Sequence, residues 1–189
     1  MDASYGYAET AFQRLSTDVN TNELITPVFA LQKLTEQRVH DALSLNLLGL
    51  LLERLGQHHR AAQSFASAIL AVEAQIEEEK ITAEEGQTRL SKIHANLSRC
   101  LVATGDFQGG IASYENHQQQ SVYAQLNAGI AHYFLDQLPE SLSLFESALN
   151  ATQEDITLRQ DVVVLLAKVL WALEGEEQRS VAKEQLFSR

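Results

Sequence analysis

The chain has 189 residues, of which 45% are apolar and 21% are charged, and its formal net charge is −11. This size and apolar fraction allow one substantial core or one continuous solenoid core. With only two prolines and nine glycines, the composition favours helix throughout. An acidic surface repels phosphate backbones, and the basic residues are dispersed, so we expect no direct binding to nucleic acid.

The cysteine content and the hydropathy pattern limit the cellular setting. Cys100 is the only cysteine, so no intrachain disulfide can form, and its apolar neighbours predict a buried thiol, as in a reducing compartment. The most apolar run, residues 43–52, is too short and too polar to span a bilayer. No basic region precedes an apolar run at the N-terminus, unlike a secretory signal. We expect a cytoplasmic protein, with the nucleus as the alternative, and no membrane partner.

Two helices are predicted within residues 1–41. The first lies within residues 2–15, where Ala8, Phe12 and Leu15 form a stripe at helical spacing. The second runs from about residue 23 to residue 37, with Pro27 in its first turn, where a missing N–H is harmless. Its apolar face comprises Leu24, Val28, Leu31 and Leu34.

Residues 42–75 predict the clearest pair of helices. The first helix ends near Leu55, Gly56 supplies the turn, and the second covers residues 60–74. Short side chains let paired helices cross closely, and one aromatic ring fills the remaining gap. The residues in these roles are Gly49, Ala61 and Ala68, with Phe65 as the ring.

The charged segment of residues 76–90 lengthens the spacing between pairs. Thr82 is followed three residues later by Glu85, as in a capping box at a helix start. We therefore predict that the helix before this segment and the helix after it are both extended. A disordered loop is the alternative.

Three further units follow. Residues 91–121 and 122–160 each predict a pair of helices, with turns near Gly105 and Asp136. Residues 161–189 predict a partial terminal unit that starts near Asp161 with Val164, Ala167, Trp171 and Gly175. Trp171 is expected in the core, and a short second helix is expected over residues 179–187. A solenoid normally ends in a polar capping helix, so this ending predicts a piece of a longer array.

One spacing recurs in the second helix of the pairs: a small residue, an aromatic residue four positions later, and a small or polar residue three positions after that. The copies are Ala61, Phe65 and Ala68; Gly110, Tyr114 and His117; and Ser141, Phe145 and Ala148. This is the pattern of the tetratricopeptide (TPR) repeat, a helix–turn–helix unit of about 34 residues. We predict an all-α fold, an α-α superhelix (TPR solenoid) of stacked antiparallel helix pairs in a single array over residues 1–189.

The sequence has none of the common catalytic signatures. It contains no glycine-rich phosphate loop, no G-x-S-x-G and no HExxH. His58 and His59 lack partners at zinc-like spacing and are interpreted as exposed turn residues. His94 and His132 fall on first helices of their pairs, where packing or groove lining is expected. We predict no enzyme activity, no cofactor and no metal.

The first helices of TPR pairs line the concave face, so polar residues there are the binding candidates. They are Asn46, Lys92, Asn96, Tyr123 and Asn127. An asparagine can both donate to and accept from an extended peptide backbone. A hydrogen bond from asparagine to the neighbouring repeat is an equally good interpretation. The carboxylate clamp of co-chaperone TPR domains is incomplete, since Tyr123 and Asn127 occupy positions that carry Lys and Arg there.

Several segments resemble the large TPR scaffold subunit of the superkiller complex: residues 46–68, 93–114, 124–148 and 164–187. The resemblance implies a fragment of a non-enzymatic scaffold that holds an RNA helicase and WD-repeat propellers for exosome-linked cytoplasmic 3′-to-5′ mRNA decay. One alternative is an unrelated TPR adaptor that binds a peptide in its groove. Another is a regulatory helical ligand sensor, with a closed apolar pocket near His94 or His132.

Overall fold

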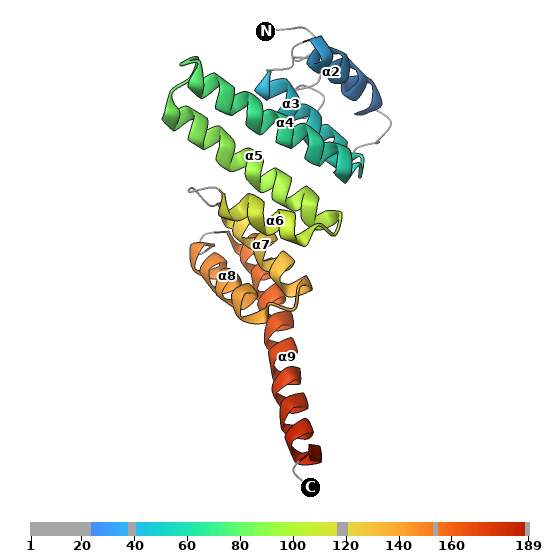
Figure 1. The fold of residues 1–189 in the computed structure, drawn as a ribbon, viewed down its shortest axis with the longest axis vertical. Helices are drawn as coiled ribbons and strands as arrows, with labels where there is room; N and C mark the ends of the chain where they lie inside the picture. Colours follow the sequence, from blue (N-terminus) through green and yellow to red (C-terminus); the bar gives the residue numbers. More distant parts are fainter. Residues whose placement is uncertain (1–23, 38–40, 117–120, 153–154, 188–189) are drawn as a thin grey trace.

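The fold consists of α-helices that follow one another along an elongated body (Figure 1). The computed structural model describes residues 24–37, 41–116, 121–152 and 155–187. The helices are α2 (Ile25–Gln37), α3 (Ala42–Arg54), α4 (His58–Glu77), α5 (Ala83–Ala103), α6 (Phe107–Glu115), α7 (Val122–Phe134), α8 (Leu138–Ala151) and α9 (Ile156–Phe187). The helix predicted over residues 2–15 and the repeat position His117 lie outside the described residues.

Successive helices pack as antiparallel pairs, α3 with α4, α5 with α6 and α7 with α8. Each pair also contacts the next, through α4 on α5, α6 on α7 and α8 on α9. The first helices of the pairs, α3, α5, α7 and α9, are called the A helices below, and α4, α6 and α8 the B helices. The prediction of an all-α array of stacked antiparallel helix pairs is confirmed.

The first and third pairs are held by the same contact between a glycine and a phenylalanine ring. A Cβ atom placed on Gly49 would lie 2.6 Å from Cε1 of Phe65, and one on Gly129 would lie 2.5 Å from Cε1 of Phe145. Both rings are buried. Each ring therefore fills the volume that a side chain on the facing A helix would need.

The middle pair is joined differently, through small residues and hydroxyl groups. The Ser98 hydroxyl on α5 donates to the carbonyl of Gly110 on α6, at 2.9 Å. The Ser113 hydroxyl on α6 donates to the carbonyl of His94 on α5, at 3.2 Å. The middle pair thus lacks the ring contact and depends on polar contacts, whereas the third pair has both, since the Ser141 hydroxyl on α8 donates to the carbonyl of Gly129 at 2.8 Å.

The turn within each pair reverses the chain at a residue with positive φ: 71° at Gly56, 84° at Gly105 and 61° at Asp136. The next N–H along bonds back into the A helix; for example, Gln137 N donates to the carbonyl of His132 at 2.9 Å. This is the Schellman arrangement, which satisfies carbonyls at a helix end. The third turn uses Asp136 where the other two use glycine.

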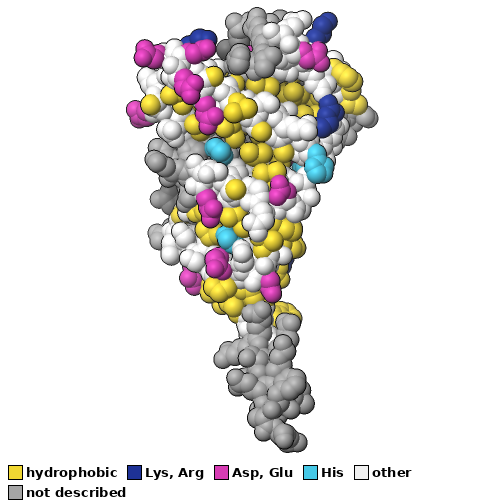
Figure 2. Space-filling model, viewed as in Figure 1, with side chains coloured by type: hydrophobic (Ala, Val, Ile, Leu, Met, Phe, Trp, Pro, Cys, Tyr) yellow, Lys and Arg dark blue, Asp and Glu magenta, His cyan; other side chains and the backbone are white. Residues whose placement is uncertain are grey.

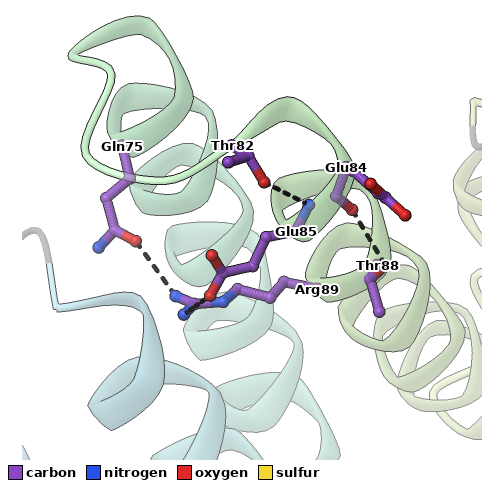
Figure 3. A network of polar contacts seen from close by, with 6 residues as sticks. All are labelled: Gln75, Thr82, Glu84, Glu85, Thr88 and Arg89. Carbon is purple, nitrogen blue, oxygen red and sulfur yellow. Dashed lines mark hydrogen bonds and ion pairs between the residues drawn. The ribbon is translucent and has the colours of Figure 1, made fainter.

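The charged segment between the first two pairs continues both flanking helices, as the extended-helix interpretation predicts. A short turn joins the end of α4 to the start of α5 (Figure 3). The Thr82 hydroxyl caps α5 by accepting from the N–H of Glu85, at 3.2 Å. The Arg89 guanidinium donates to the Glu85 carboxylate at 2.6 Å and to Gln75 Oε1 on α4 at 3.4 Å. These bonds tie the two extended helices together.

The C-terminal unit differs from its prediction in two respects. The prediction of a separate helix over residues 179–187 is wrong, because α9 continues through Gly175 to Phe187 without a turn. A single glycine costs a helix only about 1 kcal/mol relative to alanine, and good helix formers flank this one. The prediction that Trp171 lies in the core is also wrong, since this residue is 80% exposed.

The apolar core is divided into two clusters. The first runs from Leu24, just before α2, to Cys100 on α5, and the second from Leu126 on α7 to Val169 on α9. Neither cluster contains a residue of α6. The two blocks are therefore joined by the short helix α6 and by direct contact between α5 and α7.

Candidate functional site

The binding candidates from the sequence all lie on A helices. Asn46 is on α3, Lys92 and Asn96 are on α5, and Tyr123 and Asn127 are on α7. Lys92 and Tyr123 are exposed, and the three asparagines are half-buried. The structure thus places all five on the helices that the sequence assigned to them.

Two of the asparagines make hydrogen bonds within the array. Asn127 Nδ2 donates to the carbonyl of Ala95 on α5, at 3.2 Å, so it bridges two neighbouring A helices next to Asn96. Asn96 Oδ1 accepts from the Arg99 guanidinium at 3.1 Å. The Asn127 bond agrees with the interpretation of asparagine as a link between repeats, whereas the Asn96 bond stays within α5. They leave the peptide-binding role of both residues a prediction.

Asn46, one repeat away on α3, has a different environment. Its Oδ1 atom is buried and accepts no hydrogen bond from the residues that the structure describes. A buried acceptor without a donor is costly, by about 1–3 kcal/mol. Of the three asparagines, Asn46 is therefore the one whose carbonyl oxygen gains most from an added donor.

The structure also contains an ion pair between repeats that the sequence did not predict. The Arg99 guanidinium on α5 reaches the Glu53 carboxylate on α3 with two nitrogens, Nε and Nη2, the latter at 2.6 Å. The hydrogen bond with Glu53 is the main cause that raises the pKa of Arg99, and burial opposes it. The two residues are 46 positions apart, so no local spacing pairs them. The A helices are thus linked by an ion pair between the first two repeats and by a side-chain amide hydrogen bond between the next two.

The histidines take structural positions. His94 Nδ1 lies 3.2 Å from the Ser113 hydroxyl of α6, and His132 Nδ1 lies 2.7 Å from Gln137 Oε1 in the following turn. His58 and His59 begin α4 and are not in the turn before it. Among the described residues, no group of three or more His, Cys, Asp or Glu side chains is placed to hold a metal ion.

Two open hollows lie elsewhere on the surface. One is at the α4–α5 turn, lined in part by Ile76 and Ile81, and the other lies among α2, α3 and α4, lined in part by Gln32 and Arg60. Neither is lined by His94 or His132, where the ligand-sensor interpretation expects its pocket. In the parts of the chain that the structure describes, no helix has the length and apolar character needed to cross a membrane.

The solved structures that the chain resembles include two proteins of low sequence identity. MamA (residue 41 to the end) from Desulfovibrio magneticus RS-1 is 14% identical, with a TM-score of 0.48 over 93% of this chain and 98% of that one. A tetratricopeptide repeat protein from Parabacteroides merdae ATCC 43184 is 16% identical, with a TM-score of 0.34 over 92% and 79%. No protein-family model matches the chain.

Comparison with curated proteins gives more specific relatives. Superkiller protein 3 of Schizosaccharomyces pombe is 30% identical over an alignment of 204 positions. The alignment covers 98% of this chain and 14% of the relative. Superkiller protein 3 of Saccharomyces cerevisiae is 24% identical over 182 residues, covering 89% and 12%. The chain thus spans about one seventh or less of their length. With its stacked antiparallel helix pairs, it is a TPR-type array homologous to a segment of superkiller protein 3.

Proposed function

We propose that the chain is a non-enzymatic scaffold for protein–protein interaction, acting as a segment of the superkiller complex subunit. The observation that carries this proposal is the 30% identity to superkiller protein 3 over 98% of the chain. The architecture supports it, because a stacked repeat array leaves long faces for partners.

The partners that follow from this proposal are an RNA helicase and WD-repeat subunits, which the scaffold holds together for exosome-linked 3′-to-5′ mRNA decay in the cytoplasm. Contact with RNA is then made by the partners. The net charge of −11 favours that division, since an acidic array repels a phosphate backbone.

The test is affinity purification of the full chain from cytosol of its source cell, followed by mass spectrometry. We expect a helicase, a WD-repeat protein and exosome components. Recovery of chaperones alone would overturn the proposal. A matched bait with Asn150→Ala, an exposed residue on the B helix α8, reports any effect of surface substitution in general.

A second candidate is a TPR adaptor that binds an extended peptide along the A helices. The unpaired Oδ1 of Asn46 favours it. That atom is closed to solvent, so the half-buried side chain must turn outward before a peptide N–H supplies the missing donor. Lys92, Asn96, Tyr123 and Asn127 are the other proposed contacts. Asn46→Ala should weaken peptide capture, while Asn150→Ala should not. If Asn46→Ala and the double variant Asn96→Ala/Asn127→Ala both leave every partner affinity unchanged, the groove is not the site.

A further inference from the structure

Three aromatic rings meet where the turn of the middle pair adjoins the turn of the third pair. Phe107 is the first residue of α6 and Phe134 the last residue of α7. Their rings are stacked, with centroids 4.9 Å apart and planes within 11°. Tyr133 meets Phe134 edge-on, at 5.7 Å and 77°. The three rings are called the turn-edge aromatics below.

Phe134 is held in place although it is not buried. Phe107 stacks on one of its faces and Tyr133 makes a T-shaped contact with it, while 61% of the residue stays exposed. The buried rings Phe65 and Phe145, by contrast, each sit against a glycine. A ring that is fixed in orientation and still open to solvent loses little conformational entropy when a partner covers it.

The surrounding sequence carries only one sign of charge. Between Arg99 and Arg159 there is no lysine or arginine. The same stretch contains seven carboxylates: Asp106, Glu115, Asp136, Glu140, Glu146, Glu154 and Asp155. On the face shown in Figure 2, Lys and Arg side chains appear only over the upper part, and carboxylates and apolar side chains share the lower part. No basic side chain from within these repeats can therefore cover the rings.

Two of the carboxylates belong to the same turns as the rings. Asp106 immediately precedes Phe107, and Asp136 follows Phe134 by two residues. Both side chains are exposed, although one oxygen of Asp106 accepts the N–H of Gly109 at 2.9 Å. An open aromatic face beside carboxylates attracts a cation, and the planar guanidinium stacks on a ring better than an ammonium group does.

We propose that the turn-edge aromatics bind an arginine-bearing peptide segment of a partner protein. The guanidinium stacks on the open face of Phe134 and pairs with the carboxylates of Asp136 and Asp106. This inference rests on the proposed scaffold function and names the chemistry of one partner segment. Charge complementarity steers that segment to the acidic repeats and disfavours a polyanion in the same place.

The chain offers a matched control in Phe29 on α2. This phenylalanine is 66% exposed, close to the value for Phe134. It differs in its surroundings, since Lys33 lies one helical turn away on the same helix. A general preference of peptides for exposed phenylalanine would act on both residues, and the proposed site only on Phe134.

The experiment selects random short peptides displayed on phage against the whole chain. A selected peptide is then synthesised and its affinity measured by fluorescence anisotropy. We expect arginine to be enriched, and Phe134→Leu to weaken the peptide roughly fivefold to tenfold. Phe29→Leu should leave the affinity unchanged. Lysine in place of the peptide's arginine should weaken binding to the wild-type chain. Circular dichroism confirms that each variant is folded.

The proposal is overturned if no peptide is selected, if arginine is not enriched, or if Phe134→Leu and Phe29→Leu bind equally well. It is overturned also if sedimentation shows that a second copy of the chain covers Phe134. Leucine keeps apolar packing at position 134, so the variant tests the ring and spares the fold. If the affinity purification recovers a helicase and a WD-repeat protein while the selection fails, the scaffold stands and this site falls. The reverse result keeps the site and rejects the scaffold.

Discussion

Glycine at positions 49 and 129 leaves room for a phenylalanine ring from the facing helix, and this space can be tested directly. An added methyl group at Gly129 would lie 2.5 Å from the Phe145 ring, which is buried and has little room to move. Gly129→Ala should lower the free energy of unfolding by about 1–3 kcal/mol through overpacking. Urea denaturation measures the change.

The double variant Gly129→Ala/Phe145→Leu provides the control for that prediction. Leucine is smaller than phenylalanine and leaves room for the methyl group, so the double variant should be more stable than the sum of the two single changes predicts. Strict additivity would show that the ring and the glycine do not compete for the same space.

Cys100 gives the molecule a pH dependence at the alkaline end. Burial raises the pKa of its thiol from 9.0 to about 12, and the nearby Glu53 carboxylate acts in the same direction. The unfolded chain loses the thiol proton first, so this contribution to stability is complete below pH 9 and is lost between pH 9 and 12. The free energy of unfolding should fall by about 1 kcal/mol per pH unit across this range on this account.

Cys100→Ala isolates the thiol from the other groups that titrate at high pH. Its unfolding free energy, measured by urea denaturation under reducing conditions, should be lower at pH 8 but decline less steeply toward pH 12. Parallel pH curves for the two proteins would contradict a buried, protonated thiol.

Among the elements, the turn between α7 and α8 carries a local strain that its counterparts avoid. Asp136 has a φ of 61°, while Gly56 and Gly105 occupy the matching positions in the other two turns. The left-handed conformation is costly for a residue with a Cβ atom, and a carboxylate is unfavourable at a helix C-terminus. Asp136→Gly should therefore stabilise the chain by about 0.5–1 kcal/mol, offset in part by a more flexible unfolded state.

Thermal unfolding checks this prediction as a small rise in Tm. The reciprocal change, Gly105→Ala, should lower Tm because nothing blocks the methyl group and only the backbone conformation resists it. A Tm for Asp136→Gly below that of the wild-type chain would show that the aspartate makes a contact worth more than the strain.

The helices were predictable from sequence because small and aromatic residues recur at fixed spacing and because Gly56 and Gly105 mark turns. The C-terminal unit shows the limit of that signal. A separate helix over residues 179–187 was predicted, but α9 continues unbroken from Ile156 to Phe187. The same limit applies to the site. The sequence places Asn127 on an A helix, but its partner is a backbone carbonyl, and Glu53 and Arg99 meet only through the fold.

Over the whole molecule, two packed blocks are joined by the short helix α6 and by direct contact between α5 and α7. The blocks are α2–α5 and α7–α9, and α6 contributes to neither apolar cluster. Repeat arrays unfold as locally cooperative units when the coupling between units is weak. Hydrogen exchange should therefore show two protected blocks, with faster exchange in α6 than in α4 or α8.

Ser98→Ala sharpens that prediction, because it removes the hydroxyl that bonds to Gly110 and leaves the two clusters intact. We expect faster exchange across α6 and little change at the centre of α4. Uniform protection from α3 to α8 would instead mean that the array unfolds as one unit.

The links along the A helices also determine how the array can bend. Between repeats, this side is joined by the Arg99–Glu53 ion pair and by the hydrogen bond from the Asn127 amide to the carbonyl of Ala95. Polar bonds of this kind can be replaced by bonds to water. The apolar contacts of the Phe65 ring with Gly49 and of the Phe145 ring with Gly129, in the first and third pairs, cannot. We therefore expect the helix pairs to move as rigid units and the array to bend between them. Its curvature should respond to salt and to any ligand that competes for the Arg99–Glu53 or Asn127–Ala95 contact.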